Sequence, residues 1–135
     1  MKRINPRAVI SSNVEANGYL KLLKNNGVFE HMIDGYMFAA AYAIKNNLDV
    51  SSILSSKRQD IAFMEVVDDK VRLALEAGIY AICKLNNQPQ PTDEREVLEI
   101  LTRYAEAGLM SLKQRWEGKV STQIQDDIRK IISFE

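Results

Sequence analysis

Apolar residues recur at steps of three and four along most of the chain, a spacing that predicts amphipathic α-helices. Five segments follow this pattern, and polar or glycine-containing breaks of the kind that start and stop helices separate them. The predicted helices cover about residues 14–25, 28–46, 65–85, 92–116 and 121–132. The predicted fold class is therefore all-α, with a single compact bundle of about five helices.

The second predicted helix, from Val28 to Asn46, is the most apolar of the five. Its stretch Phe38–Ala43 is apolar on every side, which indicates a central helix with neighbours around it. Asp34 lies within this segment, next to Gly35. If Asp34 is buried, it needs a hydrogen-bonding or ionic partner, because an unpaired buried carboxylate is costly.

The third predicted helix carries one stripe of apolar residues at helical spacing. A break with two prolines follows it, and Thr92 and Asp93 then supply side chains that can cap the next helix. The stripe of the third helix consists of Val67, Val71, Ala74, Leu75, Gly78, Ile79, Ile82 and Leu85.

Residues 48–63, between the second and third helices, show poor periodicity and are predicted to form a long ordered loop, with a short helical turn or extended piece within it left open. Loops of this length often carry function or contact a partner. Ile53 and Leu54 are its apolar candidates for a partner contact. Trp116, at the end of the fourth helix, is a third candidate, because tryptophan is enriched at interface hot spots. Its alternative role is ordinary packing at the helix end.

The length and composition fit one globular domain spanning residues 1–135. Residues 1–12 could form a flexible arm ahead of the first helix. No apolar run reaches the length of about 20 residues that a membrane span needs. The N-terminal residues lack the apolar stretch of a signal peptide, so a cytoplasmic location is expected.

The 18 basic and 18 acidic residues give a net charge of zero, but the basic residues are concentrated at the beginning of the chain. A net charge of zero is compatible with self-association. A basic patch that neutralises phosphates would suit weak or indirect contact with DNA, whereas a solvated arm is the simpler interpretation. The candidate DNA contacts are Lys2, Arg3, Arg7, Lys21, Lys24, Lys57 and Arg58.

The residues carry no recognisable catalytic motif, metal site or cofactor site. With one histidine and one cysteine, the chain lacks the ligands of a typical zinc site. The carboxylate pairs Asp68–Asp69 and Asp126–Asp127 point about 100° apart on a helix and do not converge. A buried structural role is expected for Cys83, although a reactive pair of Cys83 with His31 stays open.

Three blocks of the sequence stand in an order that is familiar from a known family. The first comprises Val28–Glu30, Asp34 and Met37–Ala41, with its Ala-rich helix. The second is Asp69–Ile82, and the third is Glu94–Leu112, which contains a Tyr-Ala-x-x-Gly-Leu pattern at residues 104–109. Together these blocks, over about residues 28–112, resemble the family of small proteins called Dnd system-associated protein 4.

The resemblance implies an accessory role beside DNA phosphorothioation and related anti-phage defence systems of prokaryotes. It carries over no catalytic residue. We therefore expect a non-catalytic adaptor subunit of a defence complex that acts by binding protein partners. The alternative is a small DNA-contacting subunit or regulator that uses the basic residues near the N-terminus.

Overall fold

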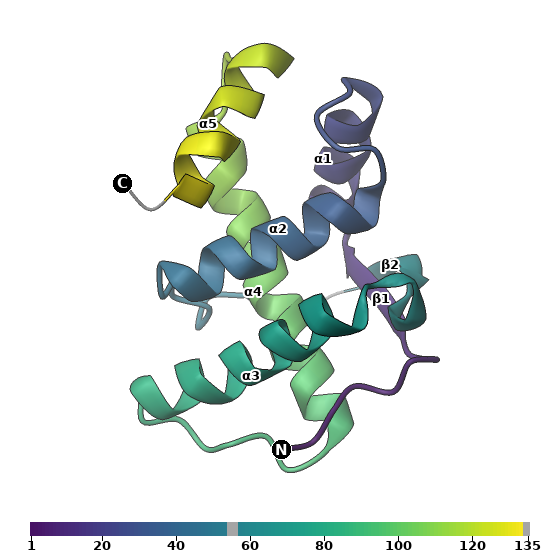
Figure 1. Ribbon diagram of the computed structural model, residues 1–135, viewed down its shortest axis with the longest axis vertical. Coiled ribbons are helices and arrows are strands. Elements are labelled where there is room, and N and C mark those ends of the chain that lie inside the picture. The colour runs from purple at the N-terminus through teal and green to yellow at the C-terminus, as the bar shows by residue number, and fades with distance from the viewer. Residues whose placement is uncertain (54–56, 134–135) are drawn as a thin grey trace.

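The computed structural model describes residues 1–53 and 57–133, and within them the chain is predominantly helical. The five expected helices are present, so this part of the prediction is confirmed (Figure 1). In chain order the elements are β1 (Val9–Asn13), α1 (Val14–Asn25), α2 (Met32–Lys45), β2 (Arg58–Phe63), the short 3-10 helix η1 (Met64–Val66), α3 (Asp69–Leu85), α4 (Glu94–Arg115) and α5 (Ser121–Ser133).

Side-chain caps fix where several of these helices begin. The Asn13 side chain accepts a hydrogen bond from the backbone N–H of Ala16, and the Asp93 side chain accepts one from that of Glu96. Helix α2 begins at Met32, later than predicted, and Asp34 accepts from the backbone N–H of His31 at its start. Asp34 is exposed there, so its role is in capping and not in the core.

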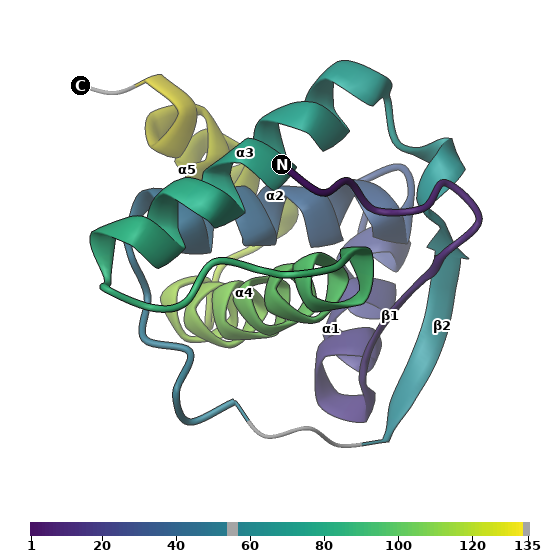
Figure 2. The same ribbon diagram turned by 90° about the horizontal axis from the view of Figure 1, so that it is seen from below.

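Helix α2 crosses α4 in the centre of the molecule (Figures 1 and 2). Gly108 of α4 lies against the backbone of Ala39 of α2, and both residues are buried. A Cβ atom at position 108 would lie 2.8 Å from the carbonyl carbon of Ala39 and closer still to its oxygen. The absence of a side chain at Gly108 is therefore what allows the two helices to approach so closely.

A two-stranded antiparallel sheet makes the fold more than all-α, and the sequence did not predict it. Strand β1 begins within the segment expected to be a flexible arm and ends one residue beyond it, and β2 lies within the segment expected to be a loop. The register pairs Val9 with Phe63 and Asn13 with Arg58, with an irregularity next to Ile10. Because the strands are far apart in the sequence, their pairing depends on tertiary contacts that local periodicity does not report.

The residues ahead of β1 are packed against the helices. Ile4 is buried, and its backbone N–H donates a 2.7 Å hydrogen bond to the buried carboxylate of Glu76 on α3. The Arg3 guanidinium donates to the same carboxylate, also at 2.7 Å. This segment is thus held in place by both an apolar side chain and a charged anchor.

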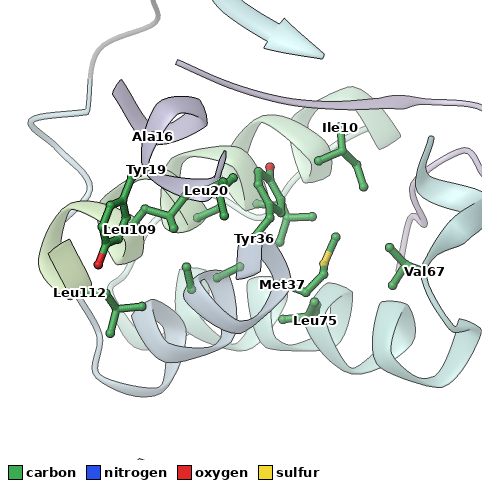
Figure 3. Close-up of a cluster of buried hydrophobic side chains, with 14 of the residues drawn as sticks. Ile10, Ala16, Tyr19, Leu20, Tyr36, Met37, Val67, Leu75, Leu109 and Leu112 are labelled. Carbon is green, nitrogen blue, oxygen red and sulfur yellow. The ribbon is translucent and has the colours of Figure 1, made fainter. Parts of the chain in front are cut away.

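The core fills the space between β1, α1, α2, α3 and α4 (Figure 3). Tyr36 of α2 is fully buried, and its hydroxyl donates to the Thr102 hydroxyl of α4 at 3.1 Å. Met37 of α2 lies beside Leu75 of α3 at the side of the core where these two helices meet (Figure 3). Both residues also line a hollow on the surface between the two helices.

Candidate functional site

Of the three partner contacts expected from the sequence, the two that lie within the described residues are buried. Trp116 is 2% exposed, so of its two predicted roles the structure supports packing at the helix end. Its indole N–H donates a 2.8 Å hydrogen bond to Asp127, and its ring stacks on Phe38 with centroids 6.3 Å apart. Ile53 is also buried, and Leu54 lies outside the described residues. The fold uses Trp116 for packing because its partners come from α2 and α5.

Asp127 joins α5 to the end of α4. The Arg115 guanidinium donates to both of its carboxylate oxygens, at 2.6 and 2.8 Å. These bonds, together with the one from Trp116, lower the pKa of Asp127 to about 2 from its ordinary 3.8. A carboxylate whose pKa falls on folding stabilises the protein above its unfolded pKa, and the contribution disappears as the pH drops through the folded pKa.

We predict that Asp127→Asn lowers the free energy of unfolding at pH 7 and that its deficit against wild type shrinks between pH 4 and pH 2. The measurement is urea unfolding followed by circular dichroism at several pH values. Asp126→Asn is the matched control, because Asp126 is exposed and its ion pair is with Arg129, one turn away on the same helix. A deficit that stays constant down to pH 2 would contradict the assignment.

The candidate DNA contacts do not form one patch. Arg3 pairs with Asp69 and Glu76, and Arg58 pairs with Glu99 and Glu106. Both guanidinium pKa values are raised by these carboxylates. The N-terminal residues lie near α3, whereas α1, which carries Lys21 and Lys24, lies toward the other end of the long axis (Figure 1).

The Arg58 pairing is part of a buried network that anchors β2 and β1 to α4. The Glu106 side chain is fully buried and accepts hydrogen bonds from the Arg58 guanidinium and from the Asn13 backbone N–H, the latter at 2.7 Å. Glu99, one-third exposed, takes the other side of Arg58 at 2.9 Å. A basic residue assigned from sequence to DNA thus serves the fold.

The open possibility of a reactive pair finds no support in the geometry. Cys83 is buried on α3, and burial raises the pKa of its thiol, which disfavours the reactive thiolate. His31 is exposed at the start of α2, with the Glu30 carboxylate 3.8 Å from its Nε2. Among residues 1–53 and 57–133, no group of three His, Cys, Asp or Glu side chains is placed to hold a metal ion.

An open groove between α2 and α3 has almost entirely apolar walls. Its volume is about 470 Å³, within the range of ligand-sized clefts. Lys45 is the one charged residue among those described along its walls. The groove is lined by Met37, Phe38, Ala41, Ile44 and Lys45 from α2 and by Val71, Ala74, Leu75 and Gly78 from α3. We call this surface the α2–α3 groove.

The α3 wall of the groove is one edge of the apolar stripe predicted on this helix. Leu75, Ile79 and Ile82 of the stripe face the core. The stripe is wider than the part that the core covers, and its other edge is open to solvent. Val71 is 45% exposed and Leu85 is 68% exposed, and Ala74 is also exposed. The width of the apolar stripe on α3 was therefore the sequence signal for this surface.

Aromatic residues of the core lie behind the α2 wall of the groove and hold it in place. Phe38 forms part of its α2 wall and is held between the rings of Phe29 and Trp116, with centroid distances of 5.9 and 6.3 Å. Trp116 is fixed in turn by Asp127. Trp116, one of the partner contacts expected from the sequence, therefore lies behind Phe38, which lines the groove.

A second, more polar cleft lies on the other side of α3, beside the ends of α2 and α3. Its volume is about 540 Å³, and Asn47 and Asn86 exchange two amide hydrogen bonds at its edge, at 2.9 and 3.1 Å. Asp49, Arg103 and Tyr104 also line it. Asp49 accepts from the Ser51 backbone N–H and Arg103 pairs with Glu99, so these groups already have partners and the cleft does not define one ligand chemistry.

Comparison of the chain with protein-family models, with curated proteins and with solved structures finds no match. No helix within the described residues combines the length and apolar character needed to cross a membrane. The geometry of the described surface favours the α2–α3 groove as the candidate site.

Proposed function

We propose that this protein is a non-catalytic accessory subunit of a cytoplasmic, prokaryotic anti-phage defence complex, and that it acts by binding a protein partner through the α2–α3 groove. The observation that carries the proposal is the groove itself, an open hollow whose described walls are apolar except for Lys45. Exposed apolar surfaces of this kind on soluble proteins mark contact sites.

The resemblance to Dnd system-associated protein 4 adds to the proposal at the same place. Two of its three blocks, Met37–Ala41 and Asp69–Ile82, supply residues of both walls of the groove. Such a family member works beside a larger DNA-modifying or DNA-cleaving machine. A groove that docks a component of that machine gives the accessory role a physical basis.

The alternative function, a small DNA-contacting subunit, is less well supported. Of the seven candidate basic residues, Arg3 and Arg58 have their charges compensated by carboxylates. If the others bound phosphates, affinity for duplex DNA would fall steeply between low and moderate salt. Absence of a mobility shift at low salt would remove this alternative.

We predict that the tagged protein co-purifies with a product of a neighbouring gene after nuclease treatment, and that Ala74→Arg abolishes the association. Ala74 is exposed on the groove wall, so arginine there fills the groove without disturbing the core. Arginine is also a good helix former, so α3 is expected to remain intact.

The matched control is Ala77→Arg, which adds the same side chain to an exposed position of α3 outside the groove lining. It should retain the partner. Loss of the partner in both variants, or in neither, would contradict docking in the groove. A partner released by nuclease in the unmodified protein would instead support the DNA-contacting alternative.

A further inference from the structure

We propose that the occupant of the α2–α3 groove is an amphipathic α-helix of the partner protein whose apolar face is flanked by carboxylates. This inference rests on the proposed function and adds the secondary structure and the charge of the partner segment. Three features of the groove lead to it, namely its walls, its length and the charges beside it.

The walls favour a helix over an extended segment. Both are α-helices, α2 and α3, whose backbone N–H and C=O groups are hydrogen-bonded within each helix. An extended segment would find no strand edge to pair with here, and its own backbone groups would lie unsatisfied against apolar side chains. A helix satisfies its backbone internally and needs only an apolar face, as in other helix-in-groove complexes.

The length and depth of the groove also fit a helix. The two wall helices run in the same direction, away from the sheet (Figure 1). The α3 lining of the groove runs from Val71 to Gly78, about 10 Å along the helix, and the exposed Leu85 continues the apolar face of α3 to about 21 Å. In the middle, Ala41, Ala74 and Gly78 have small or no side chains, which lets the backbone of an occupant approach closely.

Exposed lysines on α3 determine the charge expected of the occupant. Each residue of a helix is rotated by about 100° from the one before, so Lys70, Ala77 and Lys84 form a row on the solvent side of Ala74. Lys70 and Lys84 are exposed and form no ion pair with any described residue. They are free to meet carboxylates of a helix that lies in the groove.

The acidic groups of α3 do not compensate these lysines. Asp69 and Glu76 point to the other side of the helix, where both pair with Arg3. Asp34, at the start of α2, interacts with the N-terminal end of its own helix, where a negative charge is favourable. A partner helix with carboxylates beside its apolar face is therefore complementary to the groove, and one with lysines is not.

The first test replaces Ala74 with the photoreactive residue p-benzoylphenylalanine in the complex isolated from cells, followed by irradiation and mass spectrometry of the cross-linked peptide. The expected peptide has apolar residues at helical spacing with Asp or Glu beside them. The same photoreactive residue at Lys21, an exposed position of α1 away from the groove, controls for position and should not label the partner.

The second test is charge reversal, with the double variant Lys70→Glu/Lys84→Glu. Affinity for the same partner should fall about ten-fold at low ionic strength, with a smaller loss at high salt, as expected for charges at the rim of an interface. The control Lys21→Glu/Lys24→Glu makes the same change of charge on α1, at exposed positions away from the groove, and should leave affinity unchanged.

The outcomes separate this inference from the proposed function. A partner cross-linked from Ala74 through a segment without the helical acidic pattern, or unaffected by Lys70→Glu/Lys84→Glu, overturns the inference and leaves the adaptor role in place. A cross-link from Ala74 to a second copy of this chain also overturns it. If no partner survives nuclease treatment, the proposed function itself fails.

Discussion

Replacing Gly108 with alanine is expected to destabilise the protein by about 3 kcal/mol or more, at or above the upper end of the range for overpacked cores. The added Cβ would overlap the carbonyl group of Ala39, which is backbone and has no rotamer through which to move away. Helices α2 and α4 would have to separate along their crossing. Thermal and urea unfolding of purified protein, both followed by circular dichroism, measure the loss.

Gly18→Ala is the control for this prediction. Gly18 lies within α1, is exposed and has no atom within 4 Å of the site of an added Cβ. Alanine there should stabilise the protein by up to about 1 kcal/mol, because glycine is a poor helix former. The same substitution therefore has opposite expected signs at two helical positions. A Gly108→Ala variant as stable as wild type would show that the helices are not so closely packed.

Replacing Glu106 with glutamine is expected to lower the free energy of unfolding by about 3 kcal/mol, as when one partner of a buried ion pair is removed. Glutamine preserves the shape of the side chain but removes the charge that faces the Arg58 guanidinium. The Glu106 carboxylate also accepts from the Asn13 backbone N–H, so the loss should loosen both strands. Urea unfolding gives the free energy, and amide hydrogen exchange of residues 9–13 reports on the strands.

Glu99→Gln is the corresponding control. Glu99 binds the same Arg58 from the same helix, but its side chain is 36% exposed. The free energy of unfolding is expected to fall by less than about 1 kcal/mol there, because water can solvate the groups of a broken exposed pair. Equal losses for Glu99→Gln and Glu106→Gln would mean that burial does not determine the strength of this network.

Variants at Gly108 and Glu106 also serve as a comparison for the variants that test the groove. Gly108 and Glu106 act through the fold, whereas Ala74 and the lysines of α3 are exposed. Variants of the first kind should lose stability and partner binding together. Variants of the second kind should lose binding alone, and this difference identifies a contact surface.

The helices could be predicted from the sequence because their signals are local. Apolar spacing of three and four residues, the cap at Asn13 and the proline break before α4 each act within a few residues of chain. The sheet could not, because β1 contains two serines and the partner strand follows about fifty residues later. Its pairing is determined by the helices between them and by the Arg58–Glu106 anchor.

The apolar stripe of α3 was identified from the sequence, but it did not reveal the α2–α3 groove. The stripe on α3 was recognised, but a stripe does not say how much of its width the neighbouring helices cover. Trp116 left two roles open in the sequence, because a large aromatic residue at a helix end gives no sign of the carboxylate that will meet it. Asp127 reaches Trp116 only because α5 folds back onto α4.

The sequence by itself determined the helical character of this protein, the approximate limits of its helices and the position of α2 as its most apolar helix, since all of these follow from local spacing and propensity. Only the tertiary structure decided which apolar residues are covered and which charges are paired. Burial and ion pairing depend on distances between distant segments, and those distances turn one edge of α3 into the wall of an open groove and tie Arg3 and Arg58 to buried carboxylates.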